Sequence, residues 1–306
     1  MYLIDSNNHN VSRRGLTSLS PRHSAGPPRI RPPRVDGAVC PLLRLQAGFH
    51  ILTAVPGLLV QPCASAHGLF SRTRRRGYPK RLKGLVLFDI DGTLLRRAGP
   101  HHRDALVKAV RRVAGVATST DGVPVAGMLD RDILTAMLQR EGVSLASIHR
   151  KMPEIVAAAQ AIYVRRCPDL RRKVCPGARM LLYRLSRQGI PAGLVTGNLT
   201  RIGWRKMEQA GLRKYLQFGA FAESARDRAG LVRLALRHAR RNRWIDRTSP
   251  IALIGDHPND IRAAKANRVR SVAVATGIIS AEELREHSPD ILVEDLRSLT
   301  IEMLLG

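Results

Sequence analysis

From residue 84 to its end, the chain alternates short, largely apolar runs with longer amphipathic stretches. Apolar runs of this length, bounded by turn-forming residues, are typical of parallel strands that are buried on both faces. These runs occupy residues 85–88, 192–195, 251–254, 271–274 and 290–293. The stretches with the apolar spacing of helices are 200–210, 231–241, 258–266 and 281–286. Strands that alternate with helices predict an α/β fold, in which helices cover both faces of an open parallel sheet.

The interval between the first two predicted strands is different, because all of its patterns are helical. Its amphipathic stretches are 103–113, 130–140 and 147–165. A helical block inserted directly after the first strand is typical of a separate cap that covers the end of a sheet. We therefore expect a core domain made of residues 83–96 and 190–306, and an all-helical cap domain at residues 97–189.

Residues 1–82 precede the alternating part and differ from it in composition. Pro, Arg, Ser and Gly are frequent there, and two acidic residues stand against fourteen Lys and Arg through Lys83. Such a segment buries too little apolar surface to offset its loss of conformational entropy, so we expect a disordered basic extension. Its apolar run at 47–60 is too short for a membrane-spanning helix and is interrupted by Pro56, so no membrane span is predicted.

The purpose of this extension stays open at the level of the sequence. Its Arg- and Ser-rich, acid-poor composition suits a targeting leader, and the apolar run followed by Ala64-Ser65-Ala66 resembles a late secretory signal. An unstructured leader, or translated sequence upstream of the true start, fits the same composition. The four cysteines form no C-x-x-C pair and no Cys/His cluster, so the sequence supports neither a disulfide framework nor a zinc site, and a reducing, cytoplasmic location is the expectation.

The positive net charge of the chain raises the question of whether it binds nucleic acid. Its 51 basic and 24 acidic residues give a formal net charge of +27. Such an excess favours nucleic acid as a partner, but aromatic residues make up only 4% of the chain and leave few platforms for stacked bases. No zinc spacing, recognition-helix motif or RNA-binding signature accompanies the charge. We therefore predict no dedicated nucleic-acid module.

Two carboxylates follow the first predicted strand. Asp89 and Asp91 are two residues apart, so the pleat of the strand directs them to the same side, and Gly92 permits a sharp turn after them. Ligands of open α/β sheets bind at the carboxyl ends of the strands. Two adjacent carboxylates are costly there unless a cation or a proton joins them, and Mg²⁺ prefers oxygen ligands and bridges phosphate groups. The pair is therefore a candidate magnesium and phosphate site.

The stretch at residues 89–93, Asp-Ile-Asp-Gly-Thr, resembles the first signature of the haloacid dehalogenase superfamily, D-x-D-x-T. The second signature, an apolar strand ending in Thr or Ser, corresponds to residues 192–198. The fourth, an apolar strand ending in G-D-x-x-x-D, corresponds to residues 255–260. The resemblance covers residues 84–306 and is greatest to phosphoglycolate-phosphatase-like members with a helical cap. It implies a Rossmann-like parallel sheet.

The resemblance also implies roles for the acidic residues. Asp89 would attack phosphorus and carry the phosphoryl group as an aspartyl-phosphate. Asp91 would protonate the leaving oxygen and then activate water. The Asp89 and Asp256 carboxylates and the backbone carbonyl of Asp91 would hold Mg²⁺. Asp260 would lie behind these ligands and orient them or the basic residue.

The resemblance also implies that residues after the first two predicted strands, including the start of the helix that follows the second, bind the phosphate group. Thr196 would offer its hydroxyl group to the phosphate. The other predicted phosphate-binding residues are Gly92, Thr93, Gly197 and Asn198.

The third signature, a basic residue at a helix start, departs from the common pattern. Most relatives have Lys there, but this chain has no Lys between Lys214 and Lys265. The segment Asp227-Arg228-Ala229 is similar to the corresponding segment of one branch of the family, so Arg228 is the predicted phosphate clamp and Arg226 the alternative. A guanidinium group binds phosphate as a planar fork, whereas an ammonium group acts as a point charge.

Two further segments belong to the predicted cap. Gly127-Met128-Leu129-Asp130 resembles a G-x-T-D segment that faces the active site in related phosphatases, with Leu in place of Thr. His101 and His102 follow Gly99-Pro100, a turn signal, and a His pair in that position is expected at the surface.

The predicted function is a Mg²⁺-dependent phosphatase, a phosphoric monoester hydrolase, that acts on a small phosphorylated metabolite as a monomer or a homodimer. A helical cap that closes over a site excludes water and favours small esters over proteins. A phosphomutase of the β-phosphoglucomutase type shares the same signatures and is the first alternative. A non-enzymatic basic interaction protein on this fold is the second.

Overall fold

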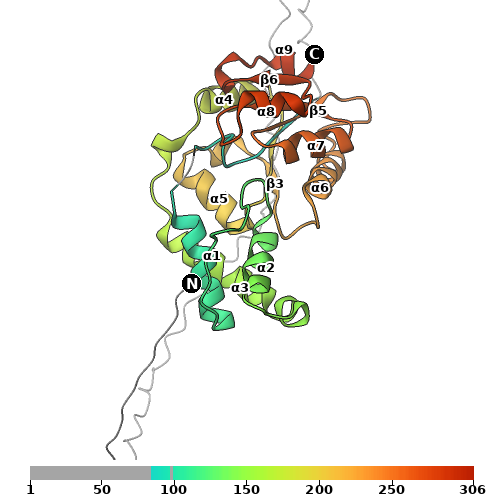
Figure 1. Cartoon of the computed structure of the whole chain (residues 1–306). Helices are drawn as coiled ribbons and strands as arrows, with labels where there is room; N and C mark the ends of the chain where they lie inside the picture. The colour runs from blue at the N-terminus through green and yellow to red at the C-terminus, as the bar shows by residue number, and fades with distance from the viewer. Residues whose placement is uncertain (1–83, 97–98) are drawn as a thin grey trace, which may run out of the picture. The chain divides into compact units, whose positions relative to one another are not determined.

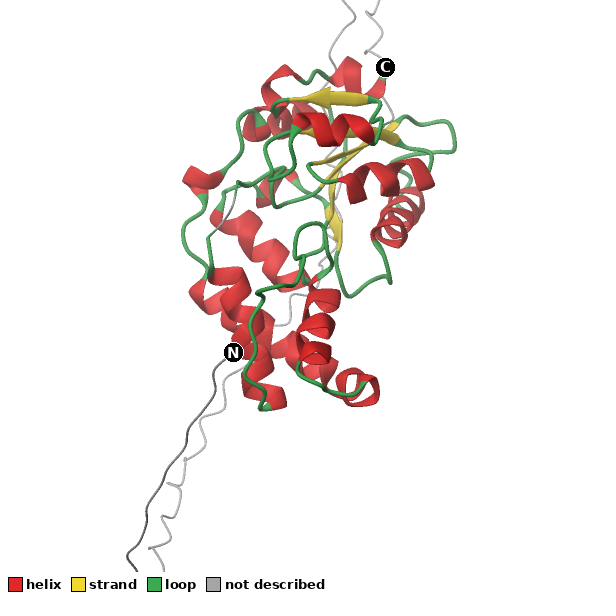
Figure 2. Ribbon diagram, viewed as in Figure 1, coloured by secondary structure: helices red, strands yellow, loops and turns green. Residues whose placement is uncertain are grey.

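The structure is a computed structural model that describes residues 84–96 and 99–306, so the predicted extension at residues 1–82 lies outside the described residues. A parallel sheet of six strands forms the centre, in the order β3-β2-β1-β4-β5-β6 (Figures 1 and 2). The strands are β1 (Leu85–Phe88), β2 (Ala192–Val195), β3 (Phe218–Ala220), β4 (Ile251–Gly255), β5 (Arg270–Val274) and β6 (Ile291–Val293). The predicted α/β architecture is confirmed.

Helices occupy most of the remaining described chain. The α-helices are α1 (His101–Ala114), α2 (Asp130–Arg140), α3 (Leu145–Arg166), α4 (Ala178–Arg187), α5 (Thr200–Gln209), α6 (Arg228–Arg241), α7 (Pro258–Ala266), α8 (Ala281–Glu286) and α9 (Ile301–Leu305). Short 3₁₀ turns are η1 (Arg171–Lys173), η2 (Arg213–Tyr215) and η3 (Leu296–Ser298). In the part of the chain that the structure describes, no helix is long and apolar enough to cross a membrane.

The central strand β1 is apolar on both sides because each of its faces is covered. Leu85 and Leu87 pack in a cluster with the side chains of α6 and α7, whereas Val86 and Phe88 pack in a second cluster with those of α4 and α9. All four side chains are fully buried. This two-sided burial explains why the strand shows a continuous apolar run instead of alternation.

Helices α1, α2 and α3 pack on one another and lie together at the end of the molecule away from β6 (Figure 1). Their shared core includes Leu106, Leu134, Met137, Ile155 and Tyr163, each at most 2% exposed. Helix α4 follows them in the chain but packs against strand β2 of the sheet and against the 3₁₀ turn η3. The division into a core and a cap domain stays a prediction.

The order of the strands determines where ligands can bind. The chain runs outward from β1 through β2 to β3 and then returns to β4 on the other side of β1. Phe88 of β1 pairs with Ile254 of β4, so the residues that follow these two strands lie side by side. Such a reversal of direction leaves a crevice at the carboxyl ends of the strands, where open α/β sheets bind their ligands.

Candidate active site

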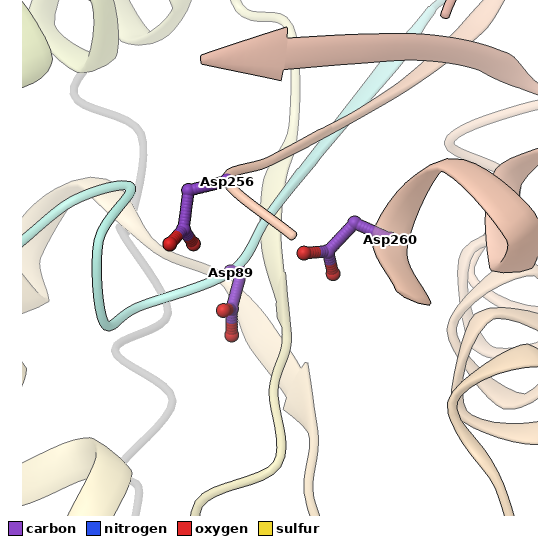
Figure 3. A group of neighbouring side chains, drawn as sticks. All are labelled: Asp89, Asp256 and Asp260. Atoms are coloured by element: carbon purple, nitrogen blue, oxygen red, sulfur yellow. The ribbon is translucent and has the colours of Figure 1, made fainter. Parts of the chain in front are cut away.

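Three carboxylates converge at this crevice, and each is placed by the end of a strand or the start of a helix. Asp89 follows β1, Asp256 follows β4, and Asp260 lies in the first turn of α7 (Figure 3). All three are buried, and one oxygen of each lies within 4.8 Å of the others. The sequence predicts Asp89, Asp256 and Asp260 as neighbours, and the structure brings them together.

The position of the Asp256 side chain requires neighbouring residues without a Cβ atom. Gly92 has φ +88°, and a Cβ atom there would overlap the Asp256 carboxylate, as would one at Gly277. Glycine is therefore needed at position 92 both for its left-handed backbone and for its lack of a side chain. The Thr93 hydroxyl donates to Asp256 Oδ1 at 3.2 Å. The Gly92 N–H is itself bonded to the Leu95 carbonyl at 2.7 Å.

The electrostatics of the three carboxylates favour a bound cation. Burial, together with the negative charges of Asp89 and Asp260, raises the pKa of Asp256 well above its ordinary value. Burial raises the pKa of Asp260 to about 7, and the Asp89 charge adds to the effect while Arg228 opposes it. Within the described residues, Asp89 Oδ1 is buried without a hydrogen-bond partner. A hard divalent ion would supply the missing partner and relieve the repulsion, so this donor set fits Mg²⁺.

Arg228 is the first residue of α6, which begins where the Asp227 side chain accepts a hydrogen bond from the Gly230 N–H at 2.6 Å. The Arg228 side chain is 8% exposed, forms an ion pair with Asp260, and has its Nη1 atom 3.4 Å from Asp89 Oδ2. Arg226, the alternative, is exposed. The structure therefore brings Arg228, and not Arg226, to the carboxylates.

Thr196 follows β2, the other neighbour of β1. Its hydroxyl oxygen accepts hydrogen bonds from the Asn198 backbone N–H at 3.3 Å and from Asn198 Nδ2 at 2.8 Å. With its oxygen occupied as an acceptor, the hydroxyl keeps its proton for a ligand in the crevice. Gly197 lies under the Met128 carbonyl, which a Cβ atom would overlap.

The second aspartate of the first signature has a partner that the sequence does not predict. Asp91 is half-exposed, and the ammonium group of Lys206 on α5 contacts both its oxygens, at 2.8 and 2.6 Å. Burial alone would raise the pKa of Asp91, but the positive charge of Lys206 and the hydrogen bonds from Lys206 and Asn198 outweigh it and lower that pKa. The helical spacing of the sequence could have indicated this buried lysine, because Lys206 lies on the same face of α5 as the apolar residues Ile202 and Met207.

The first turns of the helical block contact the same crevice. The Asp130 N–H donates to the Gly197 carbonyl at 2.8 Å, and Asp130 Oδ2 accepts from the Leu199 N–H at 2.8 Å. His102 Nε2 lies 2.9 Å from Asp130 Oδ2. The expectation that His102 is a surface residue is wrong, because helix α1 directs its ring toward α5.

A cavity of about 460 Å³ lies between the ends of the strands and the helices α1 and α2. Asp89, Asp91, Thr196, Arg228 and Asp256 line it from the sheet. The lining from the helical side includes His102, Arg103, Met128 and Ile133. The carboxylates thus face a space for one small molecule, with cationic and apolar groups on the opposite wall.

Known proteins resemble this chain in sequence and in fold. The sequence model of the haloacid dehalogenase-like hydrolases matches residues 84–267. A phosphoglycolate phosphatase of Pseudomonas fluorescens is 29% identical over 231 residues, which cover 72% of this chain and 79% of that protein.

Solved structures resemble the chain at lower identity and bear on the fold alone. A β-phosphoglucomutase of Clostridium difficile has a TM-score of 0.54 at 18% identity, covering 72% of this chain and 94% of its own. The protein CbbY of Rhodobacter sphaeroides, solved with phosphate, has a TM-score of 0.54 at 20% identity, covering 72% and 98%. Because the family match spans more than half of the chain, the chain belongs to the haloacid dehalogenase-like hydrolases, in the phosphatase branch that its signatures predict.

Proposed function

We propose that the protein hydrolyses a small phosphate monoester with Asp89 as the nucleophile, through an aspartyl-phosphate. The observation that carries this proposal is the convergence of Asp89, Asp256 and Arg228 on one small cavity. Asp89 Oδ2 lies near the Arg228 guanidinium group, which offsets the negative charge that accumulates when a carboxylate attacks a phosphate.

The metal in this proposal is Mg²⁺, held by the carboxylates of Asp89 and Asp256 and by the backbone carbonyl of Asp91. When bound, it would neutralise charge on the phosphate and on the attacking carboxylate. Asp260 would stay behind these ligands, because Arg228 occupies its Oδ1 and the His257 N–H occupies its Oδ2. Its role would be to hold Arg228 in place.

The proton in this proposal is carried by Asp91. In the first half-reaction, the bond from Asp89 to phosphorus forms, the bond to the leaving oxygen breaks, and Asp91 gives its proton to that oxygen. In the second, water attacks phosphorus, its proton passes to Asp91, and Asp89 is released. Both halves use the same carboxyl group, which therefore has to lie on the leaving-group side of the phosphate.

Thr196 would bind the phosphate with its hydroxyl proton, and Gly197 would add its backbone N–H group ahead of α5. The Asn198 N–H already donates to Thr196 Oγ1, so Asn198 would orient that hydroxyl group. Gly92 and Thr93 have their own partners in Leu95 and Asp256. We assign them the shaping of the turn under the phosphate, with no direct contact from the Thr93 hydroxyl group.

The substrate class follows from the cavity and from the relatives. About 460 Å³ accommodates a small metabolite, and Arg103 on its wall favours a second anionic group. The Pseudomonas relative is a phosphoglycolate phosphatase. We therefore place phosphoglycolate first among the substrates to test, and small sugar phosphates second.

The test is phosphate release from a panel of phosphorylated metabolites, measured with Mg²⁺ and with EDTA. We expect release from a small ester that EDTA abolishes and that added Mg²⁺ restores. Isomerisation of a sugar phosphate without phosphate release would instead identify a mutase. Release at the same rate in EDTA would contradict the metal assignment.

A further inference from the structure

Lys206 is a buried cation for which the proposed phosphoryl transfer has no role. It lies on α5, and its side chain is 1% exposed. Burying an ammonium group costs several kcal/mol before its partners are counted. An apolar residue of similar volume would serve the packing of α5 as well or better, so packing alone does not account for a lysine at this position.

All of the donors of Lys206 have partners among the described residues. Besides Asp91, its ammonium group contacts Asn198 Oδ1 at 2.6 Å and His102 Nδ1 at 3.2 Å. These three residues offer four acceptor atoms to the three protons of the ammonium group, so one proton is shared between two acceptors. Lys206 therefore has no donor left for a phosphate group, and this distinguishes it from Arg228.

The partners of Lys206 are themselves held in place. His102 Nδ1 faces the ammonium group and must accept, so the ring carries its proton on Nε2, which lies 2.9 Å from Asp130 Oδ2. Tyr163 packs edge-on against the His102 ring, with 5.6 Å between ring centroids. Asn198 Nδ2 donates to Asp91 Oδ2 at 2.8 Å while its Oδ1 accepts from Lys206. The position of the ammonium group is therefore fixed by side chains from α1, from α3 and from the loop that precedes α5.

The consequence is an Asp91 carboxylate that is fixed at both oxygens. Lys206 donates to Oδ1 and Oδ2, and Asn198 donates to Oδ2. A half-exposed aspartate on a glycine turn would otherwise rotate among several rotamers. An acid or base that is misplaced by about 1 Å loses much of its effect, because proton transfer needs hydrogen-bond geometry at the reacting oxygen.

We propose that Lys206 is a positioning residue that fixes the Asp91 carboxyl group for proton transfer to the leaving oxygen. This inference rests on the proposed function, because it assigns Asp91 the role of acid and base. Loss of a merely structural lysine would slow the reaction of every ester alike, whereas loss of Lys206 should slow the attack by Asp89 only where the leaving oxygen needs a proton.

The first experiment compares aryl phosphates whose leaving groups need a proton to different extents. Phenyl phosphate has a basic leaving group, 4-nitrophenyl phosphate a weaker one, and 2,4-dinitrophenyl phosphate leaves without protonation. For Lys206→Met we expect kcat/KM to fall by about a hundredfold with phenyl phosphate, on the scale of general acid catalysis, and by less than about threefold with the dinitrophenyl ester. Lys206→Arg should recover part of the loss, and the exposed Lys214→Met is the matched control.

The second experiment asks whether Lys206 acts through Asp91, by measuring phenyl phosphate hydrolysis in a double-mutant cycle. In an Asp91→Asn background, Lys206→Met should cost less than about threefold, because the carboxylate that it positions is already gone. The double variant removes both charges of the pair, so it folds even if Lys206→Met alone leaves too little folded protein to assay.

Two results would overturn the inference. An equal loss of kcat/KM across the three esters would make Lys206 a general structural or electrostatic residue. Full additivity of Lys206→Met and Asp91→Asn would separate the lysine from the acid. Failure of the proposed function is distinguishable from both, because it would appear as wild-type protein without Mg²⁺-dependent hydrolysis of any of the three esters.

Discussion

At the scale of single residues, the site is a balance of charges in a small buried volume. Three carboxylates are each at most 7% exposed: Asp89, Asp256 and Asp260. Among the described residues, Arg228 is the cation that contacts Asp89 and Asp260 directly. One guanidinium group cannot compensate three carboxylates, which is why the pKa values of Asp256 and Asp260 are raised. Changes at these positions should therefore affect chemistry far more than folding.

The nucleophile is tested by Asp89→Asn, which removes the attacking carboxylate and hardly changes the side-chain volume. We expect turnover to fall by about three orders of magnitude or more, measured as phosphate release. The fold should persist, because one of three clustered negative charges is removed. The control is Asp104→Asn, an exposed carboxylate on α1. Activity within tenfold of the wild type would contradict the role of Asp89.

The third signature is tested by Arg228→Ala and Arg226→Ala. Because Arg228 lies 3.4 Å from Asp89 and Arg226 is exposed, we expect kcat/KM to fall by about a hundredfold for the first and by less than about threefold for the second. Arg228→Lys should restore part of the loss, because lysine keeps the positive charge. The restoration should be incomplete, because a point charge replaces the planar fork of the guanidinium group. A damaging Arg226→Ala beside a mild Arg228→Ala would contradict this assignment.

At the scale of elements, the segment between α1 and α2 contacts the core at the site itself. Gly127 has φ +65°, its carbonyl accepts from Asn259 Nδ2 at 2.8 Å, and its Cα faces the His257 ring, with which a Cβ atom would overlap. Beside it, Asp130 binds backbone groups of Gly197 and Leu199. These contacts join the helical block to the loops after β2 and β4.

The importance of this contact is tested by Gly127→Ala against Gly115→Ala. Both glycines have positive φ, so both alanines carry a backbone strain of about 1 kcal/mol, but Gly115 has no atom near its Cβ position. We expect Gly127→Ala to lower kcat/KM about tenfold or more and Gly115→Ala to leave it unchanged, at similar unfolding temperatures. Equal kinetics of the two variants would mean that this contact has no part in catalysis.

At the scale of the whole molecule, the described sheet and site are built from residues that follow position 84. The family match begins at residue 84, and the strands and site residues described here all follow it. The clusters on both faces of β1 are built from side chains between residues 85 and 305. The described part therefore contains its own hydrophobic core.

A chain that starts at Lys80 should accordingly remain soluble and keep its kcat. The expected result is the same kcat for phosphate release and an unfolding temperature that matches that of the full chain, because the core and the site keep their contacts. Limited proteolysis of the full chain should remove the first 80 residues early. Loss of activity on truncation, or protection of residues 1–80 from protease, would contradict this.

The local patterns of the sequence determined most of the elements and the central chemistry. Buried runs located β1, β2 and β4 within a residue of their observed ends, because a strand covered on both faces must be apolar throughout. The D-x-D pair was recognisable because its position after a strand has meaning in any open α/β sheet. Strand β3 was missed because its sequence, Phe-Gly-Ala, has no β-branched residue, whereas the equally short β6 is Ile-Leu-Val.

The tertiary structure decided which distant side chains meet. Lys206 reaches Asp91 across 115 positions of sequence, and Asn259 reaches Gly127 across 132. The choice of Arg228 over Arg226 depended on where α6 begins and on which side chain then turns toward Asp260. Such contacts follow from the packing of non-adjacent elements, and the local sequence pattern does not specify which partner each side chain meets. For this protein, the sequence specified most of the sheet and the acidic residues of the proposed site, and packing specified the partners of Asp91.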